Sequence, residues 1–286
     1  MRLAREAGAI IVSADSMQVY RGMDIGTAKP TLAERDEVPH YLVDLVDPEE
    51  PFSVADYQRE SRRVVTDNSD RRILVVGGSG LHVRALLDPL EFPPHDPTVR
   101  LDLSALDPKE ARRRLEAADP GAGAIVDLAN PRRVERALEI LEITGLTPSQ
   151  RAMTGSARSV AAYEPLLAFA GFGIDAGERL AQRIATRMDS MVDAGFVEEV
   201  RSLRGRLGVT ARAAAGYTEF AAHLDGELTL AEAKKLTRNA TMALAKRQRT
   251  YFGRDPRLTW IRWDAEPEER YRSFRAELDR LGLWTS

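Results

Sequence analysis

The sequence predicts an α/β fold, in which a parallel sheet is flanked by helices and the chain is interrupted by a helical insertion. Two apolar runs, at 9–12 and 73–76, have the length and composition of buried strands. Helical segments alternate with them, which is the order of a parallel sheet with crossover connections. Between about 96 and 148 only helical patterns occur.

The first predicted strand covers residues 9–14 and is followed by two polar residues, Asp15 and Ser16. Residues 41–46 are expected to form a second short strand. A capping box of Ser53 and Asp56 then predicts a helix that extends to about residue 66.

A third strand at 73–76 runs into the glycine-rich turn 77–80, and 81–87 reads as a helix. In parallel sheets ligands bind beyond the carboxyl ends of the strands. Asp15 and the turn are therefore both expected at the ligand-binding edge.

The Pro-Pro-His-Asp-Pro segment at 93–97 separates this part from the helical insertion. Within the helical insertion, Asn130 is the expected N-cap of a helix that has proline at its first position. Gly145 is expected to end that helix. Residues 166–174 return as an apolar strand of the core. A long helix at about 177–203 follows. Another begins at Thr229, whose capping box is completed by Glu232, and runs to about residue 249.

Composition excludes several classes of protein. The chain has no cysteine, so disulfide scaffolds and thiolate zinc sites are ruled out. No apolar run approaches the length of a membrane span, and no secretory signal is visible, so we expect a cytoplasmic protein without membrane contact. The scattered histidines form no cluster, so any metal is expected to be an oxygen-bound ion such as Mg²⁺.

The net charge of −3 hides an uneven distribution. From 237 to 262 basic residues dominate, which is the electrostatic feature expected of a nucleic-acid-binding segment. Only five of the 41 basic residues are lysines. In an arginine-rich chain, each of these lysines is a candidate for a tight site at which an ammonium group is needed.

Several residues suit chemistry, and each has a structural alternative. Asp15 can act as a general base or hold a metal, or it can cap the next turn. The 77–80 turn can bind an anion through its amides, although such turns are common. Arg183 and Arg187 share a helix face and suit a diphosphate, or they line a solvated surface. Basic and aromatic residues at 246–252 suit RNA, or form a basic helix end.

The order of these features along the chain resembles the tRNA dimethylallyltransferases, also called isopentenyl-pyrophosphate:tRNA transferases. The most specific match is the block from Ser13 to Pro30. Shorter matches follow in the family's order at 38–40, 43–48, 77–81, 133–139, 216–219 and 245–248. The resemblance implies a P-loop NTPase-like, nucleotide-binding sheet, with a catalytic core of 1–95 and 149–286 and a tRNA-contacting helical insertion at 96–148.

The resemblance also implies a reaction. A dimethylallyl group would pass from dimethylallyl diphosphate to N6 of the adenosine 3′ of the anticodon, with pyrophosphate released and Mg²⁺ assisting. Asp15 matches the residue that accepts the N6 proton. Arg183 and Arg187 would stabilise the leaving diphosphate, and the base must leave its stack to reach Asp15. The partners would be the anticodon stem-loop and the diphosphate, and we expect a monomer.

The site residues implied by the resemblance fall into two sets. The diphosphate would contact Thr27, Lys29, Arg183 and Arg187. The tRNA would contact Asp15, Ser16, Met17, Gln18, Ser79, Arg100, Arg132, Arg133, Val134, Glu135, Arg136, Lys246, Arg247, Gln248 and Arg249.

The sequence departs from the family pattern at its start. Members carry a P-loop about one helix before the Ser-Ala-Asp-Ser strand, whereas no G-x-x-x-x-G-K-[ST] pattern occurs here. Residues 1–6 resemble the end of the helix that follows that loop. We expect a start assigned too far downstream rather than a truncated active enzyme. Ser79 replaces the family's usual threonine and keeps its hydroxyl group, and residues 126–128 replace a His-Pro segment.

Two other functions compete with the prenyltransferase hypothesis. A P-loop-type small-molecule kinase would share the sheet, but the basic and aromatic segment 246–252 argues against it. A catalytically impaired tRNA-binding fragment would bind tRNA in a salt-sensitive way without binding the diphosphate.

Overall fold

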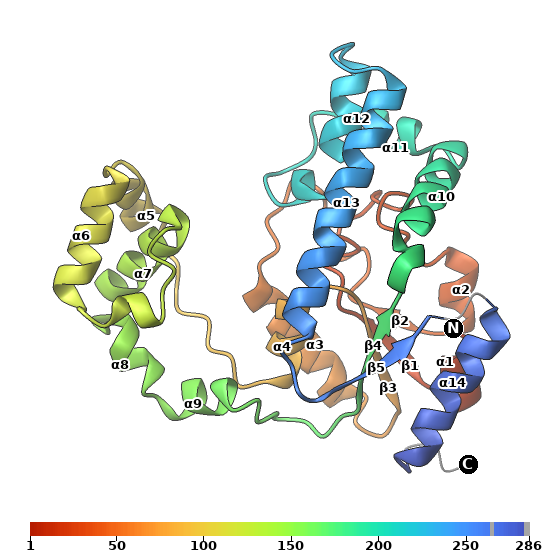
Figure 1. The fold of residues 1–286 in the computed structure, drawn as a ribbon, viewed down its shortest axis with the longest axis horizontal. Helices are drawn as coiled ribbons and strands as arrows, with labels where there is room; N and C mark the ends of the chain where they lie inside the picture. The colour runs from red at the N-terminus through yellow and green to blue at the C-terminus, as the bar shows by residue number, and fades with distance from the viewer. Residues whose placement is uncertain (264–265, 283–286) are drawn as a thin grey trace. The chain divides into compact units, whose positions relative to one another are not determined.

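In a computed structural model, which describes residues 1–263 and 266–282, the chain divides into two compact units. One comprises Met1–Leu86 and Phe169–Ser286, and the other comprises Leu87–Ala168. The strands of the first unit are parallel and are flanked by helices (Figure 1), so the predicted α/β class is confirmed.

The central sheet of the first unit has the order β2-β1-β3, and every pairing in it is parallel. The strands are β1 (Ile10–Ser13), β2 (His40–Tyr41) and β3 (Ile73–Val76). All four residues of β1 are buried, because the strand lies between two neighbours. Ser13 is in register with Val76, so β1 and β3 end at the same edge. This register is what brings Asp15 and the 77–80 turn together.

The predicted strand at 166–174 is confirmed only over 171–174, because residues 166–170 are not part of a strand. The strand observed there is β4 (Gly171–Asp175), and it pairs with β5 (Leu258–Arg262) in a separate two-stranded sheet. β4 does not pair with any strand of the β2-β1-β3 sheet among the described residues. Leu166 is 54% exposed and no residue of 166–170 is buried, so the apolar composition of this stretch did not indicate a buried strand.

The predicted strand at 41–46 is also largely wrong. β2 ends at Tyr41, and Leu42 and Asp44 have positive φ angles of 62° and 55° that no strand accommodates. Asp44 is held in this conformation by side-chain bonds to Lys29 and Arg35. Tertiary ion pairing therefore overrides the apolar pattern of the segment.

The helices of the first unit cover its sheets and build a bundle beside them. Both capping boxes predicted there, Ser53 with Asp56 and Thr229 with Glu232, are present. The single helix predicted at 177–203 is wrong, because Gly195, with a φ angle of 99°, divides it in two. The helices are α1 (Arg2–Ala7), α2 (Leu32–Glu37), α3 (Val54–Asp67), α4 (Gly80–Leu87), α10 (Leu180–Asp193), α11 (Phe196–Leu203), α12 (Tyr217–Leu224), α13 (Leu230–Phe252) and α14 (Pro267–Arg280), with short 3₁₀ turns at Gly177–Arg179 and Ala211–Ala213.

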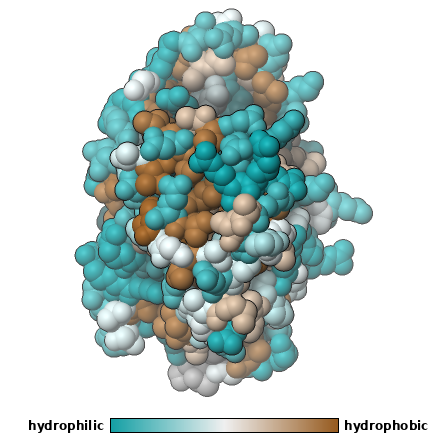
Figure 2. All heavy atoms as spheres, turned by 90° about the vertical axis from the view of Figure 1, so that its left-hand side faces the viewer, coloured by the Kyte–Doolittle hydropathy of each residue, from teal (hydrophilic) through white to brown (hydrophobic). Residues whose placement is uncertain are grey.

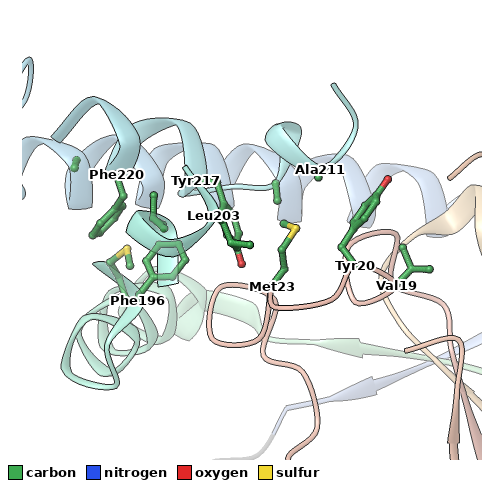
Figure 3. Packing of buried hydrophobic residues seen from close by; sticks show 12 residues of the cluster. Val19, Tyr20, Met23, Phe196, Leu203, Ala211, Tyr217 and Phe220 are labelled. Atoms are coloured by element: carbon green, nitrogen blue, oxygen red, sulfur yellow. The ribbon is translucent and has the colours of Figure 1, made fainter. Parts of the chain in front are cut away.

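The main hydrophobic core of this unit joins the loop after β1 to the helical bundle. Figure 3 shows Val19, Tyr20 and Met23 of that loop facing residues of α11 and α12. Phe196 packs edge-on against Tyr217, with ring centroids 5.2 Å apart. The core therefore fixes the loop after Asp15 against the bundle.

The second unit is helical, with α5 (Pro97–Ser104), α6 (Pro108–Ala118), α7 (Pro131–Thr144), α8 (Pro148–Ala152), α9 (Gly155–Ala161) and a 3₁₀ turn at Ala122–Ala124. Its core includes Leu103, Leu115 and Leu138. As predicted, α7 begins after Asn130 and ends at Gly145 in the left-handed conformation, although the Asn130 side chain makes no capping bond. The unit extends beyond 96–148 on both sides.

The surface is mixed in polarity. On the face that Figure 2 shows, hydrophobic side chains gather in one area and hydrophilic ones surround it. None of the helices built from the described residues combines the length and the apolar character that crossing a membrane requires.

Candidate functional site

A pocket of about 740 Å³ lies in the first unit, where β1 and β3 end. This volume is within the range of small-molecule sites. Its walls come from the residues after β1, the glycine-rich turn with the start of α4, the loop at 26–27, and the helices α10, α12 and α13 with the 3₁₀ turn before α12. Of the residues predicted for the site, Asp15, Ser16, Met17, Thr27, Ser79, Arg187, Arg247 and Gln248 line this pocket.

Asp15 lies two residues beyond the end of β1 and is half-buried. Its Oδ1 accepts a bond of 2.8 Å from the backbone N–H of Met17, so this carboxylate does close a local turn. Asp15 also lines the pocket, and no further partner of its side chain occurs among the described residues. The turn fixes one oxygen and leaves the other available to a ligand.

The glycine-rich turn is packed too closely to carry side chains at its first and fourth positions, and at its second position a side chain would meet the flexible end of Gln248. A Cβ atom on Gly77 would lie 2.2 Å from the carbonyl carbon of Ala14. One on Gly78 would lie 2.3 Å from Nε2 of Gln248, and one on Gly80 would lie 2.2 Å from the ring of Tyr251. The glycines therefore let β1, the turn and α13 meet at the rim of the pocket.

Ser79 connects the two strand ends directly. Its hydroxyl oxygen accepts a bond of 3.0 Å from the N–H of Ser16, and its own N–H donates to the carbonyl of Ala14 at 3.1 Å. The hydroxyl group thus holds the segment after β1 in place. A threonine would offer the same oxygen at this position.

Gln18 is occupied inside the protein. Its Oε1 accepts a bond of 2.8 Å from the Ser13 hydroxyl, and its Nε2 donates to the carbonyls of Thr27 and Ala28 at 3.2 and 3.3 Å. Gln18 therefore joins the end of β1 to the 26–28 loop, and its side-chain amide is not directed to a partner outside the chain.

Arginines outnumber carboxylates among the described residues that line the pocket. Arg187, Arg212, Arg238 and Arg247 line it, together with Asp15 and Glu219. Such a surplus of guanidinium groups suits an anionic ligand. Sequence reasoning missed Arg212 and Arg238. Arg238 lies in the basic segment that was recognised, but nothing in the sequence places Arg212, which precedes α12, at the pocket.

The apolar part of the wall comes mainly from α10 and α13. Ile184, Met188 and Met191 share one face of α10, and Leu244 lies on α13. His82 lines the pocket as well, and burial lowers its pKa to about 4, so this imidazole is neutral at physiological pH. The pocket therefore combines a cationic and an apolar surface.

Lys29 is not a diphosphate ligand in this structure, contrary to the prediction. Its side chain is 1% exposed. Its Nζ donates to the carbonyl of Tyr20 at 2.7 Å and to the carboxylates of Asp24 and Asp44, both at 2.6 Å. The tight site suggested by a lysine in this arginine-rich chain exists, but internal carboxylates fill it.

Arg183 does not line the pocket with Arg187, although both lie on α10. The Arg183 guanidinium stacks on the Trp263 indole, 3.3 Å from the ring centre, and Arg270 stacks on the same ring at 4.1 Å. Burial and the nearby Arg270 lower the pKa of Arg183. The predicted pair of guanidiniums is therefore divided, and Arg187 alone of the two faces the pocket, where its NH2 donates to the carbonyl of Gly26 at 3.3 Å.

The basic segment of α13 is divided in the same way. Gln248 and Arg247 line the pocket, whereas Lys246 lines only a shallow depression of about 420 Å³ next to the same helix, which Arg247 also borders. Arg249 stacks on Trp260 at 3.6 Å and pairs with Asp175 at 3.2 Å, so it is engaged with the β4-β5 sheet.

The remaining predicted tRNA contacts lie in the second unit. Arg100, Arg132 and Arg133 are exposed there, and Glu135 is half-buried on α7. Val134 is 1% exposed in the core of the unit, so it offers no side chain to RNA. The Arg136 side chain is 34% exposed, and its guanidinium donates to the carbonyl of Pro93 at 2.8 Å and to the buried Glu139 at 2.7 Å. The prediction for Val134 is therefore corrected, whereas Arg136 is engaged within the unit and its predicted contact with RNA stays a prediction.

The donor groups for a metal ion are sparse. Within residues 1–263 and 266–282, no group of three or more histidine or acidic side chains could hold a metal. Mg²⁺ commonly takes most of its ligands from water and from substrate phosphates. The chain itself thus offers no metal cage in its described part.

A family model described as IPP transferase matches residues 18–255 of this chain. A tRNA dimethylallyltransferase of Nocardioides sp. is 44% identical over 271 residues, covering 92% of this chain and 86% of the relative. One of Salinispora arenicola is 45% identical over 269 residues, covering 91% and 76%. The full-length tRNA isopentenylpyrophosphate transferase of Bacillus halodurans has a similar structure, with a TM-score of 0.69 at 34% identity over 99% of this chain and 90% of its own. The chain belongs to the tRNA dimethylallyltransferase family, also known as the IPP transferases.

Proposed function

We propose that the chain transfers a dimethylallyl group from dimethylallyl diphosphate to N6 of the adenosine 3′ of the anticodon in tRNA. The observation that carries the proposal is the lining of one pocket by the Asp15 carboxylate, by arginines and by an apolar wall. A prenyl diphosphate needs a cationic and an apolar surface together, and the acceptor amine needs a base. The names of the relatives agree with this chemistry.

In the proposed reaction the bond between C1 of the prenyl group and the diphosphate oxygen breaks, and a bond forms between C1 and N6. The N6 lone pair is delocalised into the purine, so the amine is a poor nucleophile and gains from losing its proton as it attacks. Asp15 accepts this proton on the oxygen that Met17 leaves available. The electron pair of the broken bond leaves with pyrophosphate.

The arginines of the pocket would stabilise the departing diphosphate. Charge accumulates on its oxygens as the bond breaks, and Arg187, fixed by the Gly26 carbonyl, is positioned by a backbone contact rather than by a competing carboxylate. Met188, Met191 and Leu244 would hold the five-carbon group and exclude water from the developing allylic cation.

We assign Mg²⁺, when it is used, to the diphosphate rather than to a protein cage. Bound there it would neutralise part of the phosphate charge. No step derived for the residues of this chain depends on it. Recognition of the anticodon stem-loop by Arg100, Arg132, Arg133, Glu135, Lys246 and Arg247, and a cytoplasmic, monomeric state, belong to the same proposal.

The experiment is transfer of labelled dimethylallyl diphosphate to an anticodon stem-loop, with wild type compared with Asp15→Asn. The amide keeps the shape of the carboxylate but cannot take the proton, so we expect the rate to fall by about 10²–10⁴-fold with RNA binding unchanged. A stem-loop carrying inosine at the target position, which has no exocyclic amine, is the matched substrate control. Label in the inosine RNA would exclude N6 as the acceptor. Full activity of Asp15→Asn would exclude Asp15 as the base. RNA binding by the wild type without transfer would show a binding protein instead.

A further inference from the structure

Glu199 lies behind the pocket rather than in it. It belongs to α11 and is not among the described residues that line the pocket. Its carboxylate faces three consecutive backbone amides of the loop after β1. Oε2 accepts from the N–H groups of Asp24 and Ile25 at 2.9 and 2.7 Å, and Oε1 accepts from that of Gly26 at 3.1 Å.

Successive amides that point to one place form a concave anion site, which in many proteins binds a phosphate. Here the anion is a side chain of the same protein. Tyr217 completes the arrangement, because its hydroxyl donates to Oε1 of Glu199 at 2.7 Å. Burial and the neighbouring carboxylate raise the pKa of Tyr217, so the hydroxyl keeps the proton that it donates.

The loop is also in tight contact with the bundle. A Cβ atom on Gly26 would lie 2.5 Å from the Tyr217 hydroxyl oxygen and 2.6 Å from Cε2 of Phe196. In Figure 3 Phe196 and Tyr217 lie beside the loop that carries Met23. The contacts of Glu199, Tyr217 and Phe196 thus hold one side of residues 24–26.

The other side of the same residues belongs to the pocket. Gly26 and Thr27 line it, and the carbonyl of Gly26 is the acceptor for the Arg187 guanidinium at 3.3 Å. A continuous series of bonds therefore runs from Tyr217 through Glu199 to the Gly26 backbone, and from there to Arg187. Displacement of the loop would move the backbone carbonyl that orients Arg187.

We propose that Glu199 is a positioning residue, which fixes residues 24–26 by an internal anion–amide contact and through them orients Arg187 toward the diphosphate. The effect of this role on catalysis rests on the proposed function. The contact with the amides can be tested without any activity. Glu199 itself touches neither substrate nor reacting atoms in this account.

The test uses Glu199→Gln in the full chain, with Glu198→Gln as the matched control. Glu198 is the preceding residue, its side chain is 66% exposed, and it pairs with Arg201 at 3.4 Å. A glutamine at 199 keeps the size of the side chain, but it places an NH₂ group, which is a donor, against the amides of 24–26 and the Tyr217 hydroxyl, which are also donors. We expect hydrogen exchange of the amides at 24–26 to accelerate in Glu199→Gln and to stay at the wild-type rate in Glu198→Gln. Unchanged exchange in Glu199→Gln would overturn the proposal, whether or not the chain is active.

The catalytic part is tested by a double-mutant cycle with Arg187→Ala. Misplacement of a positioning contact costs up to about 10²-fold in rate, so we expect kcat to fall by at least about 10-fold in Glu199→Gln, with KM for the stem-loop unchanged. Tyr217→Phe, which removes one donor and leaves the carboxylate, should give a smaller loss. In the Arg187→Ala background the further loss should be under about 2-fold, because residues that act as a unit are not additive.

Additive losses would refute action through Arg187 and indicate general structural damage. If Glu199→Gln does not fold, Tyr217→Phe tests the proposal instead, by the same double-mutant cycle and the same exchange measurement. If wild type and Glu198→Gln both make no product, the proposed function fails, and the exchange rates at 24–26 still decide whether the contact exists.

Discussion

Replacing Lys29 with methionine separates the two roles considered for this residue. The substitution keeps the aliphatic stem and removes the ammonium group that Asp24, Asp44 and the Tyr20 carbonyl surround. If Lys29 is structural, the loss appears in the free energy of unfolding. If it binds the diphosphate, the loss appears in KM for that substrate.

The magnitude follows from the burial of the three groups. Removing one partner of a buried ion pair costs about 3–5 kcal/mol. The lower end applies here, because the Asp24 side chain is 58% exposed and can turn to water, and Asp44 keeps Arg35 at 2.6 Å. We therefore expect a loss of about 3 kcal/mol, which corresponds to a fall in Tm of about 6–12 °C.

Urea unfolding is the assay, with Lys235→Met, an exposed lysine of α13, as the control that should change stability by less than about 0.5 kcal/mol. The pH dependence gives a second readout. Burial acts to raise the pKa of Asp44, but the bonds from Lys29 and Arg35 outweigh it and the pKa is lowered from 3.8. This stabilisation is complete above about that pH and is lost as the pH falls through the lower, folded pKa. The difference in free energy of unfolding between wild type and Lys29→Met should therefore become smaller below about pH 4. Unchanged stability together with a raised KM would refute the structural role.

Three further predictions concern other contacts. Gly77→Ala should lower the free energy of unfolding in urea by at least about 3 kcal/mol, because the added Cβ meets the Ala14 backbone. Gly78→Ala should lower it by under about 1 kcal/mol, because its Cβ meets only the flexible end of Gln248. Equal losses in the two variants would contradict the packing described. Glu139→Gln should destabilise the second unit by about 2 kcal/mol, because Glu139 is 2% exposed and bonded to Arg136 and His95. Hydrogen exchange of the α7 amides measures this loss, and exchange at the wild-type rate would contradict the prediction. Since the pKa of His82 is lowered to about 4 from 6.5, stability should fall as the pH decreases between these values; His82→Phe should flatten that dependence, and an unaltered slope would assign it to other groups.

The sequence predicted the part of the site that depends on strand direction. Asp15 and the turn before Gly80 follow two strands, and parallel strands in register must end at the same edge. The bond between Ser16 and Ser79 is a direct consequence, although 63 residues separate them. The helix break at Gly195 was also within reach of sequence reasoning, because glycine with a positive φ is a common helix terminator.

The errors at Arg183 and Lys29 have a different origin. Helical spacing places Arg183 and Arg187 on one face of α10, but it cannot show that Trp263, 80 residues later, takes one of the two guanidiniums. A lysine that matches a functional motif looks the same in sequence whether its partner is a phosphate or the carboxylate of Asp44. Distant side chains decide both cases, and a local pattern contains no information about them.

The block from Ser13 to Pro30 shows why a motif can identify a family correctly and still mislead about individual residues. Ser13 bonds Gln18, Gln18 bonds the Thr27 carbonyl, and Lys29 bonds Asp24, so these side chains are used to hold the segment in shape. A catalytic carboxylate needs such a scaffold, because a base that is free to move loses most of its advantage. The block is therefore specific mainly for a loop geometry. Within it, the proposed base is Asp15, whose side chain lines the pocket and keeps one oxygen without a partner among the described residues.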